Sequence, residues 1–174
     1  MDRYAARLDK YERFLRECLV RAKPDIIIWG PGRSDAQRYE KRKCVRNAIQ
    51  RVVPNGDVVF PEDRKVIRAT KKALGSGKVD DMERVQALTA DIVIALDISA
   101  AVGEEVARYS AHPKIASKLF VVTTDAGKSG YQKAIRNQGF VHVLKADDVS
   151  SCDKPTELCI NHVRSWCVQK CLRE

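Results

Sequence analysis

Three carboxylates that lie close together in the chain are candidate catalytic groups. Asp97 follows an apolar, β-branched run, and Glu104 and Glu105 follow within eight residues. A buried parallel strand that ends in Asp97 places these carboxylates where open α/β sheets form their ligand crevice. Two carboxylates that are confined together can also raise the pKa of one another. We therefore expect the chemistry of the protein at these three residues.

We prefer Glu105 as the nucleophile, with Glu104 as the alternative and Asp97 as the orienting group. Glu104 lies nearer the start of an expected helix, where an acidic side chain also complements the helix dipole. The same effect offers a simpler interpretation of both glutamates as solvated dipole partners. Asp97 could likewise be a turn former at the end of a strand.

A glycine-rich loop earlier in the chain is a candidate binding segment. It follows the apolar run 25–29 and consists of Gly30, Pro31, Gly32, Arg33 and Ser34. Backbone N–H groups at the start of the next helix could bind a phosphate or a ribose there, and Arg33 would add positive charge. The loop could also be a plain strand-to-helix turn.

Three further side chains complete the predicted substrate site. They are Tyr39, Asp63 and Ser99. Tyr39 and Arg42, which are three residues apart on one predicted helix, could reach back into the crevice, although a surface or half-buried position suits both. Asp63 could contact a ribose or base, or act only as an acid at a helix N-terminus.

Alternating strand and helix patterns must position these residues. Apolar runs predict strands over 25–29, 57–60, 91–96, 118–123 and 140–144. Helical spacing predicts an N-terminal helix ending before Pro24 and further helices near 35–52, 63–74, 80–89, 102–111, 128–138 and 155–172. Because strands alternate with helices, we expect βαβ units and a parallel sheet whose carboxyl ends gather at one ligand-binding edge.

The predicted fold is therefore α/β, a three-layer αβα arrangement with a largely parallel five-stranded sheet of the flavodoxin or Rossmann type. A length of 174 residues suits a single domain, 1–174. Within it we expect an N-terminal helix (1–23), a sheet core (24–145) and a C-terminal helix (155–172).

The composition of the chain limits which binding partners and which cellular location we expect. The net charge of +9 favours phosphate-bearing ligands or a nucleic-acid surface. The basic clusters 38–43 and 65–72 belong to no recognisable nucleic-acid-binding module, so solvated helix faces explain them better than nucleic-acid binding. The charged N-terminus lacks the apolar stretch of a signal peptide, and no apolar run reaches the roughly 18 residues of a membrane span. We expect a cytoplasmic protein with no membrane partner.

The six cysteines are expected to be thiols, because a chain without an export signal stays in a reducing compartment. Cys159, His162, Cys167 and Cys171 could be imagined as zinc ligands, but no Cys-x-x-Cys pair occurs. Ile160, Val163, Cys167 and Cys171 instead predict the core stripe of a helix. We predict no metal site and no cofactor.

The order of these strand-end residues resembles the nucleoside 2-deoxyribosyltransferase-like superfamily. The matching features are Gly30-Pro31 after the first strand, Pro61-Glu62-Asp63 after the second, Ala90-Asp91 before the third, and the pair Glu104/Glu105 in the following helix. They lie within residues 24–125. The outline is also similar to TIR-type domains, which split the glycosidic bond of NAD with a Glu.

The resemblance implies an enzyme that cleaves or transfers at the N-glycosidic bond of a nucleoside, nucleotide or NAD-like substrate. It also implies a Glu nucleophile, no metal or prosthetic group, and a homo-oligomer in which neighbouring subunits complete the site. Two alternatives stay open: a non-catalytic nucleotide sensor or signalling module using the same crevice, and a nucleic-acid-binding protein.

Overall fold

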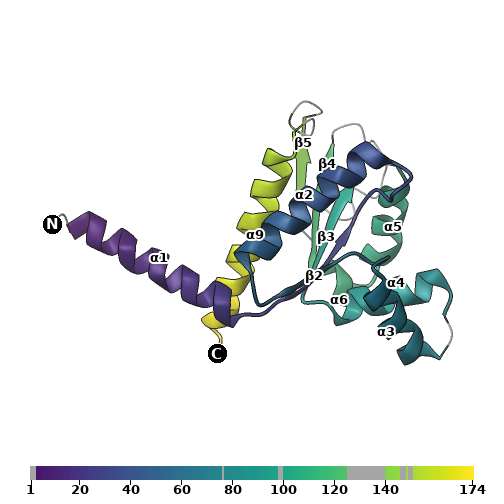
Figure 1. The fold of residues 1–174 in the computed structure, drawn as a ribbon, viewed down its shortest axis with the longest axis horizontal. Coiled ribbons are helices and arrows are strands. Elements are labelled where there is room, and N and C mark those ends of the chain that lie inside the picture. The colour runs from purple at the N-terminus through teal and green to yellow at the C-terminus, as the bar shows by residue number, and fades with distance from the viewer. Residues whose placement is uncertain (1–2, 76, 98–99, 125–139, 146–147, 149–150) are drawn as a thin grey trace.

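A single five-stranded parallel sheet forms the centre of the protein (Figure 1). The computed structural model describes residues 3–75, 77–97, 100–124, 140–145, 148 and 151–174. The strands are β1 (Asp25–Trp29), β2 (Asp57–Val59), β3 (Ile92–Asp97), β4 (Leu119–Thr124) and β5 (Phe140–Leu144). All neighbours run parallel in the order β2-β1-β3-β4-β5. This is the flavodoxin-like order, in which the winding direction changes between β1 and β3.

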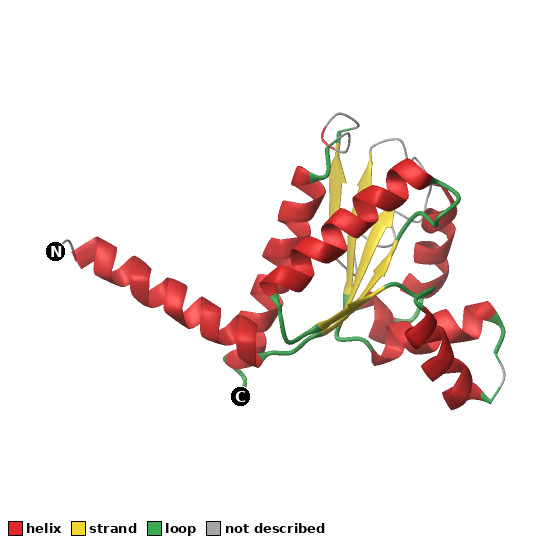
Figure 2. Ribbon diagram, in the orientation of Figure 1, coloured by secondary structure: helices red, strands yellow, loops and turns green. Residues whose placement is uncertain are grey.

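Helices cover both faces of this sheet (Figure 2). On one face lie α2 (Ala36–Val52) and α9 (Asp153–Cys171). On the other lie α4 (Val79–Thr89), α5 (Ala100–Ser110) and the short α6 (Pro113–Ala116), with α3 (Arg64–Leu74) beside α4. The predicted three-layer α/β fold of the flavodoxin or Rossmann type is confirmed.

Alternation along β1 explains why its sequence is continuously apolar. Ile26 and Ile28 pack into the core beneath α2 and α9, whereas Ile27 and Trp29 pack into the core beneath α4, α5 and α6. A parallel strand covered on both faces has no solvent-exposed side, so apolar residues occupy consecutive positions.

The predicted strands and helices agree with the structure to within a few residues. β2 is shorter than predicted, because the backbone N–H of Phe60 donates to the Asp63 carboxylate at 2.9 Å instead of continuing the ladder. The helix predicted near 128–138 lies outside the described residues.

The N-terminal helix α1 (Arg3–Arg21) ends before Pro24, as predicted, but extends away from the sheet (Figure 1). Only its last turns are covered, where it contacts α9. Five large apolar side chains along it are exposed: Tyr4, Leu8, Tyr11, Phe14 and Val20. Helical periodicity therefore predicted the element but not what it contacts. None of the described helices is both long and apolar enough to cross a bilayer.

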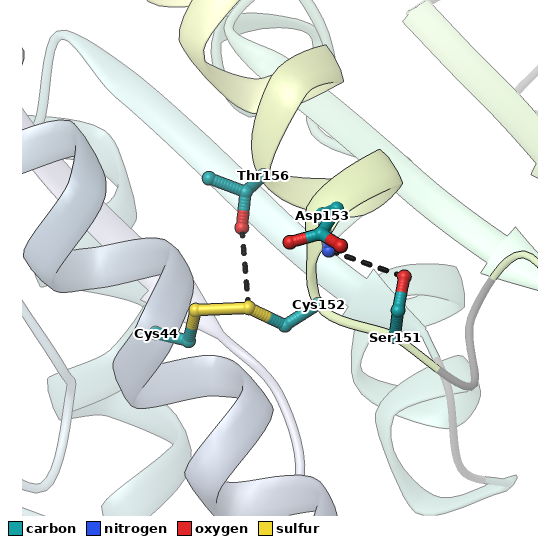
Figure 3. Close-up of a disulfide and its surroundings, with 5 residues drawn as sticks. All are labelled: Cys44, Ser151, Cys152, Asp153 and Thr156. Carbon is teal, nitrogen blue, oxygen red and sulfur yellow. Dashed lines mark hydrogen bonds between the residues drawn. A yellow bond between two sulfur atoms is a disulfide. The ribbon is translucent and has the colours of Figure 1, made fainter.

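The prediction that all six cysteines are thiols is wrong for two of them. Cys44 on α2 forms a disulfide with Cys152, the residue before α9, across a sequence separation of 108 (Figure 3). The two helices pack side by side on the same sheet face, and this brings the two Cα atoms to 6.7 Å. Because disulfides are typical of oxidising compartments, the cytoplasmic location stays a prediction.

The core stripe of α9 is also rotated from the predicted one. Cys159, Val163 and Cys167 are buried, whereas Ile160 and Cys171 are only half-buried. The stripe does pack against the sheet as an apolar element. No group of three or more potential metal ligands occurs among the residues that the structure describes.

Reduction of the Cys44–Cys152 bond is expected to lower the free energy of unfolding by roughly 2–4 kcal/mol, because a long closed loop restricts the unfolded chain. Urea unfolding with and without a phosphine reductant measures the difference. Cys171→Ser is the matched control, since Cys171 is a free thiol and the variant should keep the response to reductant. Equal midpoints with and without reductant in the wild-type chain would contradict the expectation.

Acid is expected to destabilise the protein through His162. Its ring stacks on Phe120 with the centroids 4.2 Å apart, and burial, aided by nearby His142, lowers the pKa of His162 from 6.5 to about 4. The unfolded chain therefore takes up a proton in a pH range where the folded chain does not, so stability is lost as the pH falls through that range.

The measurement is urea unfolding at pH 7.5 and pH 5.0 for the wild type and His162→Gln. We expect the acid-induced loss to be roughly 1–2 kcal/mol smaller in the variant, since one pKa unit corresponds to about 1.4 kcal/mol. The same loss in both proteins would show that another group is responsible.

Candidate functional site

A cavity of about 460 Å³ lies at the carboxyl ends of β1 and β2. Open α/β sheets bind ligands at this edge, near the point where the winding direction changes. Its lining comes from β1 and the loop after it, the loop after β2, and helices α2, α3 and α4. The lining residues are Trp29, Gly30, Gly32, Arg33, Arg42, Pro61, Glu62, Ile67, Val79, Met82, Glu83 and Gln86.

The predicted glycine-rich loop contributes directly to this cavity. Gly30, Gly32 and Arg33 line it, whereas Ser34 is exposed and does not. Pro31 is buried, and its carbonyl accepts a hydrogen bond from Arg42 Nη1 at 3.4 Å. The loop therefore combines both roles considered from the sequence: it forms a strand-to-helix turn and borders a cavity.

Tyr39 and Asp63 lie beside the cavity rather than in its wall. The Tyr39 ring packs against Phe60, and the guanidinium of Arg33 lies 6.0 Å from its centroid. The Asp63 carboxylate accepts the Phe60 N–H and lies 3.6 Å from Arg46 Nη1. Asp63 precedes α3 without a side-chain capping hydrogen bond, so its carboxylate stabilises the turn after β2.

The three predicted catalytic carboxylates belong to elements at the same sheet edge. Asp97 ends β3, two residues beyond the Ala95 position that pairs with Trp29 of β1. Glu104 and Glu105 belong to α5. Of these three residues the structure describes the backbone alone, and Ser99 lies outside the described residues. Their catalytic roles therefore stay predictions.

Arg42 lines the cavity, which agrees with the alternative in which it reaches back into the crevice. It is only 2% exposed, so the surface or half-buried position is wrong for this residue. Its two Nη atoms donate to the Glu62 carboxylate at 2.6 and 3.0 Å, and its Nε donates to the Ile28 carbonyl at 3.2 Å. Its guanidinium carbon also lies 4.1 Å from the Phe60 ring centroid. The sequence does contain a signal for this burial. Arg42 falls three residues before Val45 and seven before Ile49, which places all three on the buried face of one helix.

The close packing of Arg42 explains one glycine of the loop. A Cβ at position 30 would lie 2.9 Å from Arg42 Cδ, closer than carbon atoms approach without a shift. Gly32, in contrast, has nothing within 4 Å of an added Cβ. Gly30 therefore lets the loop pass over the buried guanidinium.

Glu83 supplies a second carboxylate to the cavity wall, in a different environment from Glu62. It accepts a hydrogen bond from the Tyr109 hydroxyl at 3.1 Å, and burial raises its pKa. Glu62, in contrast, is paired with a buried guanidinium. Nothing in the local sequence around Glu83 distinguishes it from other helical acids.

Replacing Arg42 by Met is expected to destabilise the protein by roughly 3 kcal/mol, because Glu62 and two backbone carbonyls lose their donor. Arg38→Met is the matched control one turn earlier on the same helix. Arg38 pairs with Asp35 at the surface, so its loss should cost about 1 kcal/mol or less. Urea unfolding compares the two variants, and equal losses would show that Arg42 is not the stronger support.

No protein-family model and no curated protein matches the chain. Among solved structures, the chain is similar to a phosphoheptose isomerase from Francisella tularensis. The TM-score is 0.40 at 14% sequence identity, and the similarity covers 90% of this chain and 82% of the isomerase chain. A similarity of this size carries no argument about activity or ligand.

Proposed function

We propose that the chain cleaves, or transfers a group at, the N-glycosidic bond of a nucleoside, nucleotide or NAD-like molecule. The position of the cavity carries this proposal. It lies between the Gly30–Arg33 loop and the loop after β2, at the sheet edge where β3 ends in Asp97. Of the features that resemble the deoxyribosyltransferase-like superfamily, Gly30 and the Pro61–Glu62 segment border this cavity, and Asp97 ends a strand at the same sheet edge.

The cavity suits a ligand of this class in size and chemistry. Its volume of about 460 Å³ falls in the range of small-molecule sites. Ile67, Val79 and Met82 give it an apolar wall on which a base could lie, and Arg33 supplies a cation for a phosphate. Both features support a nucleotide over a macromolecular ligand.

The proposed reaction breaks the bond between C1′ of the sugar and a ring nitrogen of the base. The bonding electrons leave with the base while positive charge develops on the sugar, and a glutamate carboxylate attacks C1′. Water or a second base then displaces the glutamate. We assign the nucleophile to Glu105, with Glu104 as the alternative, and the orienting role to Asp97. Glu83 could hold the proton that the departing base requires.

A non-catalytic nucleotide sensor is the second candidate. It is favoured by the structural use of two acids at this edge, since Glu62 is paired with Arg42 and Asp63 closes the turn after β2. Such a module would need the cavity but no nucleophile.

We also propose that the protein is a cytoplasmic homo-oligomer whose neighbouring subunits complete the site. The oligomeric state comes from the resemblance, and the location comes from the sequence alone. Sedimentation velocity of the full chain tests it, and a monomer across the micromolar range would remove it.

Release of free base tests the proposed activity. The protein is incubated with adenosine, AMP and NAD, and free base is measured by chromatography. We expect release by the wild type and a loss of roughly 10³-fold or more in Glu105→Gln, because removal of a nucleophile abolishes the covalent step. Glu104→Gln is the matched control and should retain most of the activity.

Three other outcomes would change the conclusion. Full activity in both glutamine variants would show that neither glutamate is the nucleophile. A strong loss in Glu104→Gln alone would move the assignment to that residue. Binding without base release by the wild type, measured by calorimetry, would favour the sensor.

A further inference from the structure

Three free thiols lie together where the end of α1 meets α9 (Figure 1). They are Cys18 of α1, and Cys167 and Cys171 of α9. Cys18 and Cys167 are buried, whereas Cys171 is half-buried. The Cys171 thiol donates to the backbone carbonyl of Cys18, with 3.8 Å between Sγ and the oxygen. This contact joins two residues that are 153 positions apart in the sequence.

The side chains of these cysteines also interact with one another. Burial, together with a hydrogen bond to the Cys171 thiol, raises the pKa of Cys18 to about 11. Burial, together with the nearby thiols of Cys171 and Cys18, raises the pKa of Cys167 to about 12. Cys18 and Cys171 are therefore neighbours through their side chains as well as through the backbone contact.

Helix geometry decides which two of the three thiols can form a bond. Cys167 and Cys171 are four residues apart on α9, and the Cβ atoms of such a pair lie about 5–6 Å apart. A disulfide requires the two Cβ atoms to lie about 3.5–4.5 Å apart. A bond within α9 would therefore distort the helix, whereas the contact between the two helices brings Cys171 to Cys18.

The difference in exposure assigns a separate role to each thiol of this pair. A small oxidant in solution can reach the half-buried Cys171. Cys18 is 2% exposed, and its raised pKa leaves few thiolates, so it reacts poorly with molecules in solution. It can still react with the sulfur of Cys171, because the fold holds the two groups together at a high effective concentration.

We propose that Cys18 and Cys171 are a redox-active pair, which a low-molecular-weight disulfide such as glutathione disulfide converts into a covalent bond between α1 and α9. The Cys171 thiolate attacks one sulfur of glutathione disulfide, and one glutathione thiolate leaves. Cys18 then loses its proton and attacks the Cys171 sulfur, and the second glutathione thiolate leaves. The two protein thiols lose two electrons and two protons, which reduce glutathione disulfide to two thiols.

The bond would fasten the helix that has the least contact with the rest of the protein. Only the last turns of α1 are covered, where they pack against α9. Cys18 lies in those turns, so oxidation would hold the base of α1 in place and a reductant would release it. This inference does not depend on the proposed glycosidic activity.

Peptide mapping of the folded full chain tests the inference. The protein is incubated with glutathione disulfide, the remaining thiols are blocked with N-ethylmaleimide, and the chain is digested with trypsin without reduction. Cleavage after lysine and arginine places Cys18, Cys167 and Cys171 on the separate peptides 17–21, 165–170 and 171–173. We expect peptide 17–21 bound to peptide 171–173 as the main new product, and its loss after treatment with a reductant.

The Cys44–Cys152 bond is an internal control, because it should join peptide 44–46 to peptide 146–164 before and after the incubation. Three results would overturn the inference: no reaction at Cys171, glutathione attached to Cys171 without a cross-link, or peptide 165–170 bound to peptide 171–173.

Two variants distinguish the pair from the neighbouring thiol. Cys18→Ala should leave Cys171 carrying glutathione, because the thiol that displaces the glutathione is missing. Cys167→Ala is the matched control and should form the same cross-link as the wild type. A cross-link that depends on Cys167 would overturn the assignment. The peptide map of the wild-type chain decides the question even if a variant at a buried position is unstable.

Discussion

The buried guanidinium of Arg42 is the interaction on which the candidate site depends. It joins three segments that are separate in the sequence: α2, the end of β1 with its loop, and the loop after β2. A charge can be buried only when its donors are satisfied, and the planar fork of an arginine matches a carboxylate with two parallel hydrogen bonds. Glu62 provides that carboxylate. The loops at the sheet edge are therefore held in one arrangement, and Gly30 is required where the first loop crosses the side chain.

The same interaction determines which charged side chains around the cavity are paired within its wall and which are exposed. Arg42 is neutralised within the wall, so Arg33 is the lining arginine that stays exposed. Glu62 is likewise engaged, whereas burial raises the pKa of Glu83 on the facing helix. The result is a cavity with a cation at its accessible side, an apolar wall from α3 and α4, and a carboxylate on α4. This distribution is the physical basis on which we propose a ligand with an anionic end and an apolar face.

The sheet order places these features at one edge, and sequence reasoning could predict that much. The five apolar runs were recognisable because strands buried on both faces show no polar alternation. The loop residues Gly30, Gly32 and Arg33 line a cavity, as a glycine-rich loop after a first strand does in such folds, and their role in binding stays a prediction. Asp63 was a weaker prediction, because an acid before a helix can equally stabilise the turn that precedes it.

Local patterns in the sequence thus determined the element order and the edge of the sheet at which a ligand would bind, because hydrophobic period and turn residues act over a few neighbours. Tertiary packing decided the rest. The burial of Arg42 depends on Glu62, which is 20 residues away. The Cys44–Cys152 pair depends on α2 and α9 sharing one sheet face. The environments of Glu83 and Gln86 depend on how α4 packs beside the first two strands, and pairwise contacts of this kind leave no local signature in the chain.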